Sequence, residues 1–172
     1  MQNIEIKAHL RDRANVERRL AALGARKMWT RRQKDAFFAV PSGWLKIREV
    51  DGKPAEVISY RRATTHAGAR PSDYDVIVVE DASAWKRLLG RVLAADKVVE
   101  KERTLWIYEH TRVHLDRVEK LGDFLELETV VEGITLEAAR AETERISGTL
   151  GVESADLVPV PYRDLMGAVS RG

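Results

Sequence analysis

Charged side chains stand two residues apart in several separate segments whose other residues are mostly apolar. In a β-strand, residues i and i+2 point to the same face, so each segment would have one charged face and one apolar face. One such strand is ordinary, because antiparallel sheets often wet one side. The pattern recurs in five segments, which read Asn3-Ile4-Glu5-Ile6-Lys7, Lys46-Ile47-Arg48, Lys101-Glu102-Arg103, Arg112-Val113-His114-Leu115-Asp116 and Glu126-Leu127-Glu128. If the sheet closes, these charged faces would line a tunnel suited to a polyanion that is bound together with a divalent metal.

The composition predicts one soluble globular domain over residues 1–172, because 33% of the residues are charged and 44% are hydrophobic. No apolar run reaches the roughly 18 residues of a membrane span, so no membrane association is expected. The N-terminus lacks the basic-then-apolar layout of a secretory leader, which makes a cytoplasmic location the default expectation. The absence of cysteine excludes disulfides, thiolate metal sites and cysteine nucleophiles.

The charge of the chain gives no support to nucleic-acid binding. The formal net charge is only +2, and the basic residues are scattered along the sequence. We therefore expect no nucleic-acid partner. The protein could act as a homodimer.

Hydrophobic periodicity and turn residues predict an α+β fold with about eight strands and three or four helices. The Asp51-Gly52 pair predicts a hairpin, Thr135 is expected to cap a helix, and the small, polar segment 63–72 is expected to be mobile. The predicted strands are 1–10, 26–40, 44–50, 56–62, 74–80, 97–109, 112–118 and 124–131. The predicted helices are 12–23, 82–93 and 135–150, and the tail ends in a short segment at 162–168. Together they favour a closed or nearly closed antiparallel β-barrel that forms a charged tunnel, with flanking helices.

The order of these motifs resembles the CYTH family, also called triphosphate tunnel metalloenzymes. The family's N-terminal Glu-x-Glu-x-Lys strand is matched by the segment 3–7, and its first basic pair by Lys46 and Arg48. The segment 99–105 resembles a second basic strand, and the segments 115–116 and 121–128 resemble the acidic C-terminal strands. The ending at 161–167, Pro-Tyr-Arg-Asp-Leu-Met-Gly, resembles bacterial class IV adenylyl cyclases in particular.

The resemblance implies a divalent-metal-dependent enzyme that acts on a nucleoside triphosphate or an inorganic polyphosphate, with Mg²⁺ or Mn²⁺ as cofactor. Catalytic roles are implied for Glu5, Lys7 and Arg103. Contacts to the triphosphate are implied for Lys7, Lys46, Arg48, Tyr60, Arg62, Lys101, Arg103, Arg112 and Arg163, and metal ligation for Glu5, Asp116, Glu126 and Glu128. Without the resemblance, these charges would be interpreted as solvated strand faces or edge-protecting lysines.

Asn3 and His114 share the strand faces on which the charged residues lie. Asn3 stands where the family has its first Glu, and because a hard cation favours carboxylate over a neutral amide oxygen, metal affinity is expected to be reduced. His114 shares a face with Arg112 and Asp116 and is expected to be a polar wall residue.

Three functions remain open. The C-terminal tail favours a class IV adenylyl cyclase that converts ATP to cyclic AMP and pyrophosphate. The paired Glu126 and Glu128 favour a hydrolase of the tripolyphosphatase or thiamine triphosphatase kind. Asn3 favours a protein that binds nucleotide or polyphosphate without turnover.

Overall fold

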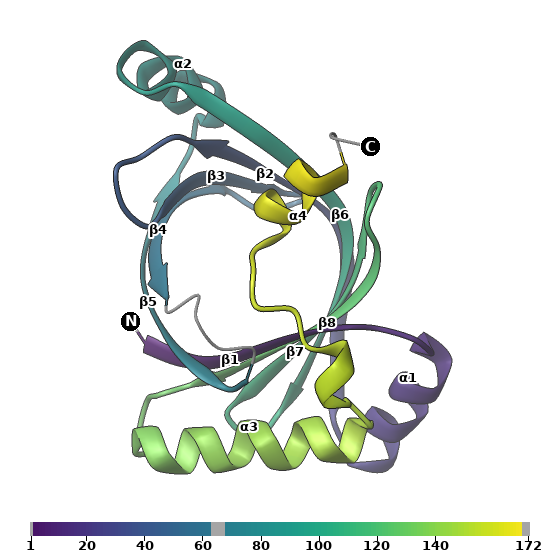
Figure 1. Cartoon of the computed structure of the whole chain (residues 1–172). Coiled ribbons are helices and arrows are strands. Elements are labelled where there is room, and N and C mark those ends of the chain that lie inside the picture. The colour runs from purple at the N-terminus through teal and green to yellow at the C-terminus, as the bar shows by residue number, and fades with distance from the viewer. Residues whose placement is uncertain (1, 63–67, 170–172) are drawn as a thin grey trace.

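Eight antiparallel strands close into a barrel in the computed structural model, which describes residues 2–62 and 68–169 (Figure 1). The strand order around the barrel is β1-β5-β4-β3-β2-β6-β7-β8, and β1 pairs with β8 to close it. The strands are β1 (Gln2–His9), β2 (Arg26–Phe38), β3 (Trp44–Val50), β4 (Ala55–Arg62), β5 (Arg70–Val79), β6 (Ala95–Tyr108), β7 (Thr111–Val118) and β8 (Gly122–Val130). The predicted closed barrel is confirmed.

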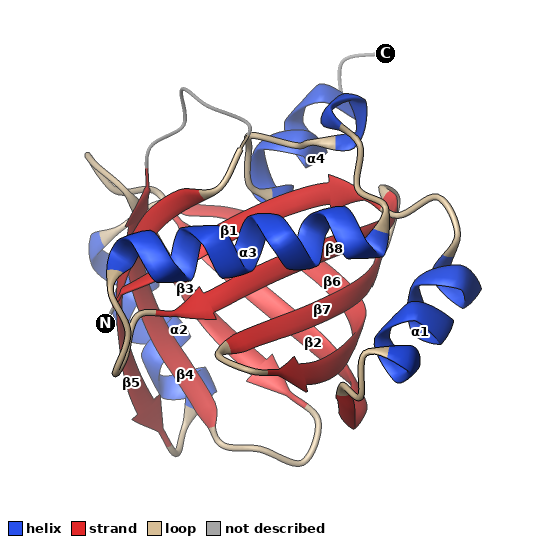
Figure 2. Cartoon of the chain, turned by 90° about the horizontal axis from the view of Figure 1, so that it is seen from below, coloured by secondary structure: helices blue, strands red, loops and turns tan. Residues whose placement is uncertain are grey.

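The helices lie outside the barrel wall or at its mouth (Figures 1 and 2). They are α1 (Arg13–Ala22), α2 (Ala82–Val92), α3 (Leu136–Leu150), a short 3₁₀ turn (Ser154–Asp156) and α4 (Tyr162–Val169). Helix α3 crosses the outer face of β1 and β8, α2 packs against β3, and α4 lies beside β6 at one end of the barrel. Within the two described ranges, no helix has the length and apolar character needed to cross a membrane.

The apolar faces of the strands point outward and are covered by these helices. Ile6, Val113 and Leu127 form a buried cluster with Leu20 of α1 and Ile146 of α3. A separate cluster beneath α2 is built on Phe38, Ile47, Ala55, Val57 and Val79. Because side chains alternate along a strand, covering the apolar faces with helices directs the charged faces into the barrel.

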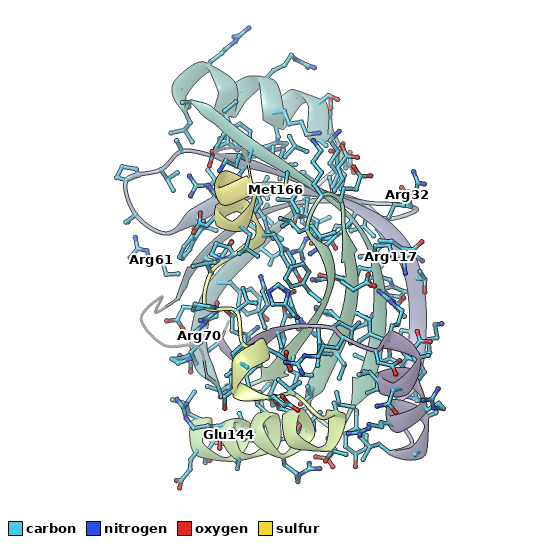
Figure 3. All side chains as sticks on the ribbon, turned by 45° about the vertical axis from the view of Figure 1, so that its right-hand side comes forward. Arg32, Arg61, Arg70, Arg117, Glu144 and Met166 are labelled. Atoms are coloured by element: carbon cyan, nitrogen blue, oxygen red, sulfur yellow. The ribbon has the colours of Figure 1, made fainter. Side chains whose placement is uncertain are left out.

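Side chains fill the space that the ribbon leaves open inside the barrel (Figure 3). Arg32, Arg61 and Glu144 are exposed and point away from it, whereas Arg70 is buried at the wall. The interior is therefore a packed polar core with a small cavity.

The fifth strand begins earlier than the sequence predicts. Strand β5 starts at Arg70 instead of Tyr74, and the backbone of Arg70 pairs with Glu5 of β1. The polar residues that suggested a loop are the inward face of a strand, whose neighbour supplies the hydrogen bonds. Residues 63–67, also expected to be mobile, lie outside the described residues.

Local sequence fixes several ends as expected. The hydroxyl of Thr135 accepts a hydrogen bond from the backbone N–H of Ala138 at 3.1 Å and so caps α3. Gly52 has φ of +69° in the turn between β3 and β4, a conformation that favours glycine. The cap fixes where α3 begins, and α3 packs on β1 and β8. The turn at Gly52 joins β3 to β4.

Candidate active site inside the barrel

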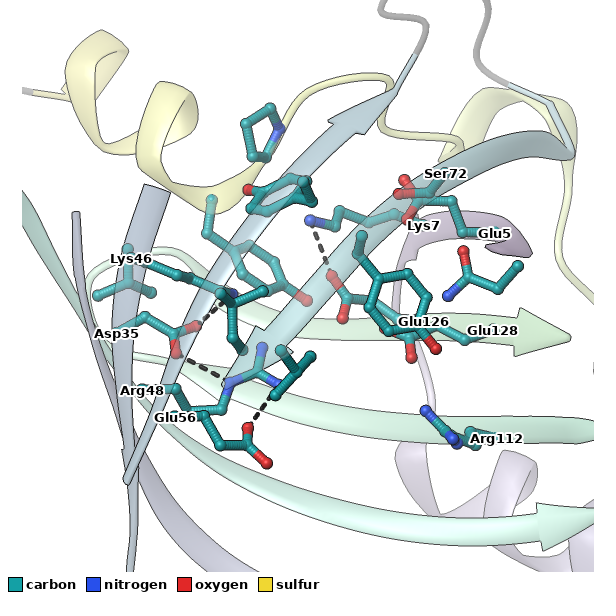
Figure 4. Close-up of a pocket in the computed structure, with 18 of the residues that line it drawn as sticks. Glu5, Lys7, Asp35, Lys46, Arg48, Glu56, Ser72, Arg112, Glu126 and Glu128 are labelled. Carbon is teal, nitrogen blue, oxygen red and sulfur yellow. Dashed lines mark hydrogen bonds and ion pairs between the residues drawn. The ribbon is translucent and has the colours of Figure 1, made fainter. Parts of the chain in front are cut away.

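A cavity of about 200 Å³ lies inside the barrel (Figure 4). Its wall is formed by side chains from all eight strands, together with Pro161 and with Tyr162 at the start of α4. The polar lining comprises Asn3, Glu5, Lys7, Asp35, Lys46, Arg48, Glu56, Tyr60, Ser72, Tyr74, Lys101, Arg112, Glu126, Glu128 and Tyr162. Basic and acidic groups thus face one small space.

One buried carboxylate organises the basic side of the cavity. Asp35 of β2 accepts hydrogen bonds from Lys46 Nζ at 2.9 Å and from Arg48 Nε at 3.1 Å, both on the neighbouring strand β3. Burial favours the neutral acid, but the charges of Lys46 and Arg48 outweigh it and hold the pKa of Asp35 well below its usual range. Asp35 therefore fixes two cations at the cavity wall.

The ammonium group of Lys46 loses its proton more easily than that of an exposed lysine. Burial, followed by the positive charge of Arg48, lowers the pKa of the Lys46 ammonium to about 7, although Asp35 acts in the opposite direction. The pKa of Arg48 is raised despite its burial, because Asp35 favours the charged form. A polyanion entering the cavity would restore the proton of Lys46.

A second buried carboxylate lies behind the wall. Both oxygens of Asp116 on β7 accept hydrogen bonds from Arg103 at 2.6 Å, and Asp116 also contacts Lys101 at 3.1 Å and the Tyr162 hydroxyl at 3.0 Å. Asp116 is fully buried. Burial opposes ionisation, but Arg103 and then Lys101 lower the pKa of Asp116 to about 2. With both oxygens engaged by these donors, Asp116 serves to position cations.

The acidic side of the cavity is formed by β8 and its neighbours. Glu126 contacts Lys7 at 2.8 Å and also pairs with Arg103, and these two cations keep the pKa of Glu126 well below its usual range despite its burial. Glu128 lies opposite Glu5 on β1, and Glu5 pairs with Arg70 at 3.3 Å. The pKa of Glu128 is also lowered despite its burial, chiefly by His114 and Arg103, so the carboxylates of Glu126 and Glu128 remain ionised inside the barrel.

A histidine completes a group that could hold a metal ion. His114 on β7 lies directly across from Glu126, and the ligand atoms of His114, Glu126 and Glu128 are all within 4.8 Å of one another. Burial, and then the nearby Arg103, lower the pKa of His114, so its neutral and ligating form is favoured. The donor set of carboxylates and imidazole fits a divalent cation.

The structure brings most of the predicted site residues to this cavity. Those at its surface are Glu5, Lys7, Lys46, Arg48, Tyr60, Lys101, Arg112, Glu126 and Glu128. Arg103 and Asp116 lie deeper, paired with each other. Arg62 ends β4 with its backbone in register with Ser72, and its side chain lies outside the described part of the structure.

Arg163 is placed away from the predicted contact. It lies on α4, is absent from the lining of the cavity, and pairs with Asp96 and with Asp164. The adjacent Tyr162 enters the barrel instead, with its ring 3.7 Å from Lys7 Nζ. Adjacent side chains on a helix point in directions about 100° apart. The sequence of the tail could not show which of the two, Tyr162 or Arg163, points into the barrel.

Sequence reasoning missed Asp35 and Arg70 as interior residues. Asp35 follows Gln33 by two positions, and Arg70 precedes Ser72 by two, so both carried the same period-two pattern that marked the other strands. Asn3 lies in the wall as expected, and its amide oxygen is buried with no hydrogen-bond partner among residues 2–62 and 68–169.

Known folds agree with this architecture. The PH1012 protein from Pyrococcus horikoshii OT3 matches with a TM-score of 0.85 and 23% identity over 95% of this chain and 98% of that one. A proposed adenylate cyclase from Vibrio parahaemolyticus matches with a TM-score of 0.80 and 14% identity over 96% and 97%. A proposed adenylyl cyclase from Hippeastrum matches with a TM-score of 0.67 and 16% identity over 97% and 96%. At these identities the likeness establishes a shared fold.

No protein curated for function matches the sequence. The family model for the CYTH domain, however, matches residues 1–162, almost the whole chain. The predicted resemblance is confirmed, and the chain belongs to the CYTH family.

Proposed function

We propose that this protein is a divalent-metal-dependent enzyme that converts ATP to cyclic AMP and pyrophosphate in the manner of class IV adenylyl cyclases. Membership of the CYTH family supports an enzyme that acts on triphosphates. The observation that carries the proposal is one cavity with Lys46, Arg48 and Lys101 on its basic side and Glu126 and Glu128 on its acidic side. A triphosphate and its metal need both kinds of group within one short span.

The basic residues would bind and orient the phosphates. Arg48 offers a planar fork of donors to phosphate oxygens, whereas Lys46 and Lys101 act as point charges. Asp35 and Asp116 hold these cations in place before the substrate arrives, so little reorganisation accompanies binding. Glu5, Glu126 and Glu128 would hold Mg²⁺ or Mn²⁺, which when bound neutralises the charge that develops on the phosphate oxygens.

Cyclisation requires the ribose 3′-hydroxyl oxygen to attack the α-phosphorus. The new O–P bond forms as the bond from the α-phosphorus to the bridging oxygen breaks, pyrophosphate leaves with that electron pair, and the hydroxyl proton passes to water. The C-terminal segment 161–167 supports this reaction, as do the names of the neighbours from Vibrio parahaemolyticus and Bacillus halodurans, both proposed adenylate cyclases.

Hydrolysis of the terminal phosphate is the second candidate. The Hippeastrum neighbour is described as having a dominant triphosphatase activity, and the paired Glu126 and Glu128 suit a metal that activates water. Binding without turnover is the third, because Asn3 replaces a carboxylate in the wall.

Product analysis tests the proposal. The protein is incubated with ATP, GTP or tripolyphosphate in the presence of Mg²⁺ or Mn²⁺, and cyclic nucleotide, pyrophosphate and orthophosphate are resolved. Cyclic AMP with equimolar pyrophosphate is expected. Orthophosphate alone would replace the cyclase with a hydrolase, and tight binding with no product would replace the enzyme with a binding protein.

Two variants tie the product to the cavity. Arg48→Ala removes a cation of the cavity wall, and we expect it to lower the rate of product formation strongly. Arg32→Ala, at an exposed position on β2 outside the barrel, is the matched control and should keep the wild-type rate. Equal rates in the two variants would place the reaction outside the barrel.

A further inference from the structure

His114 has a buried nitrogen that the fold itself does not satisfy. The residue is only 6% exposed, and its Nδ1 has no hydrogen-bond partner among the residues that the structure describes. The nearest carboxylate oxygens belong to Glu128 at 3.7 Å and Glu126 at 3.9 Å, both beyond hydrogen-bond distance. A buried polar atom in this state needs a water molecule or an ion as its partner.

Strand register places this nitrogen and two carboxylates on one patch of the inner wall. His114 of β7 is directly opposite Glu126 of β8, and Glu128 follows two residues later on the same face. Their ligand atoms lie within 4.8 Å of one another. Bonds of about 2.0–2.2 Å to a central ion hold ligand atoms roughly 3–4 Å apart, so a small inward movement of the side chains completes the site.

The charges around this patch set what can enter it. Glu5 lies across from Glu128 on β1, which adds a third carboxylate beside the group. One oxygen of Glu126 contacts Lys7 and the other contacts Arg103. A cation that binds here competes with Lys7 and Arg103 for the oxygens of Glu126, and the imidazole of His114 offers it a further ligand atom.

We infer that His114, Glu126 and Glu128 form a mixed nitrogen and oxygen site, and that it binds a first-row transition ion such as Mn²⁺ or Co²⁺ in preference to Mg²⁺. Mg²⁺ prefers an all-oxygen shell and keeps several of its waters. An imidazole ligand shifts the balance toward transition ions, whose affinity for nitrogen donors is higher. This inference deepens the proposed function by naming the metal of that site, yet it requires no turnover of ATP.

Metal binding without nucleotide tests the inference directly. Mn²⁺, Co²⁺ and Mg²⁺ are titrated calorimetrically into the full chain, and pulsed electron paramagnetic resonance of bound Mn²⁺ reports any coupling to nitrogen. We expect tighter binding of Mn²⁺ and Co²⁺ than of Mg²⁺, and a nitrogen coupling of the size that imidazole gives. Bound Mn²⁺ without nitrogen coupling, or equal affinities for Mg²⁺ and Mn²⁺, would overturn the inference.

Three variants assign the nitrogen. His114→Gln should abolish the coupling and weaken Mn²⁺ and Co²⁺ binding at least tenfold, with Mg²⁺ affinity changed less than twofold. His9→Gln, at an exposed histidine of β1, is the control and should leave all three affinities unchanged. If His114→Gln does not fold, Glu128→Gln serves, and it should weaken all three ions while the remaining bound Mn²⁺ keeps its nitrogen coupling.

The outcomes separate this inference from the proposed function. Nitrogen-coupled Mn²⁺ in a protein that forms no cyclic AMP would uphold the metal site and remove the cyclase. Cyclic AMP formed by a protein whose Mn²⁺ shows no nitrogen coupling would do the reverse.

Discussion

Two buried aspartates determine how the interior of this barrel is arranged. Asp35 accepts hydrogen bonds from Lys46 and Arg48, whereas Asp116 accepts them from Arg103 and forms an ion pair with Lys101. The sequence predicted Asp116 as an interior metal ligand and did not single out Asp35. A carboxylate fixed behind a cation holds that cation toward the cavity. Removing the carboxylate destabilises the protein, because the cation is then buried without a partner. The binding surface is therefore built from pairs of residues.

Removing Asp35 should destabilise the whole protein. Asp35→Ala leaves Lys46 and Arg48 without their shared carboxylate, and breaking such a buried pair costs about 3–5 kcal/mol. Urea denaturation gives the free energy of unfolding. Glu100→Ala, which removes an exposed ion pair with Lys34 on the adjacent strands, is the control and should change little. A loss in Asp35→Ala no larger than the control's would show that Asp35 is not a structural anchor.

Triphosphate binding should take up a proton at Lys46. The pKa of about 7 in the free protein leaves this amine mostly neutral at pH 8, and a bound polyanion raises that pKa, so binding at pH 8 draws a proton from the buffer. At pH 6 the amine is already charged and contributes no uptake. Calorimetry in buffers of different ionisation enthalpy measures the number of protons.

Lys46→Arg is the matched variant, since an arginine stays protonated at both pH values. We expect its proton uptake at pH 8 to be smaller than that of the wild type by nearly one proton, and the two proteins to agree at pH 6. The same uptake in both proteins at pH 8 would assign the proton to another group.

Among the elements, the tail that ends in α4 has the most direct effect on the cavity. The backbone N–H of Val158 donates to Lys7 O at 2.8 Å, so the tail runs beside β1 before Tyr162 enters the barrel. There the Tyr162 ring packs edge-on against Phe124 and lies near the ammonium groups of Lys7 and Lys101. A segment far from the strands in sequence thus closes one side of the site (Figure 1).

The hydroxyl of Tyr162 should contribute measurably to holding that tail. Tyr162→Phe keeps the ring contacts but removes the hydrogen bond to Asp116, and a hydrogen bond to a charged group contributes about 1.5–3 kcal/mol. The free energy of unfolding is compared with that of Tyr108→Phe, at the last residue of β6, where the ring centre lies 6.0 Å from the guanidinium carbon of Arg145. If both variants lose the same stability, the bond to Asp116 adds nothing of its own.

At the scale of the whole molecule, closure of the sheet concentrates charge that the net value of +2 conceals. Helices α1, α2 and α3 cover apolar outer faces of the strands, and the charged side chains remain inside the barrel. There the attraction between the basic side chains and a polyanion is weakly screened by salt. Most of the polar lining is contributed by strands that are distant in sequence, so a ligand bound to it joins opposite walls.

A triphosphate should therefore stabilise the fold by linkage. At 100 times its dissociation constant, a ligand that binds only the native state adds about 2.7 kcal/mol, which is roughly 5–10 °C in Tm for a chain of this size. The nucleoside monophosphate at the same concentration should shift Tm much less, because it reaches fewer cations. Thermal denaturation with ATP, AMP or no nucleotide measures both shifts.

Arg48→Ala tests whether the cavity causes this shift. Loss of a charge-assisted bond to phosphate costs on the order of 1.5–3 kcal/mol of binding, so at the same ATP concentration the shift should fall to between about one half and one tenth of the wild-type shift. Arg32→Ala, exposed outside the barrel, should keep it. An undiminished shift in Arg48→Ala would mean that ATP binds elsewhere.

Local sequence patterns were enough to predict the strands apart from the start of β5, the charged and apolar faces of those strands, and the resemblance to the family. Charges at Glu5, Lys7, Lys46 and Glu126 marked the inner faces because side chains alternate with a period of two, a property of each strand alone. The cap at Thr135 is equally local, since it depends on a hydroxyl and an N–H three residues apart.

Which side chains meet inside the barrel depends on how the sheet closes. Closure places β1 between β5 and β8, so Glu5 finds Arg70 and Lys7 finds Glu126 across strands that are far apart in sequence. The period of two assigns a residue to a face of its strand. It does not show which side chain that residue will contact or how deeply it will be buried, so the burial of Arg103 against Asp116 behind the cavity wall could not be predicted. The direction of the tail, which brings Tyr162 inward and leaves Arg163 with Asp96, follows from packing that no local pattern encodes.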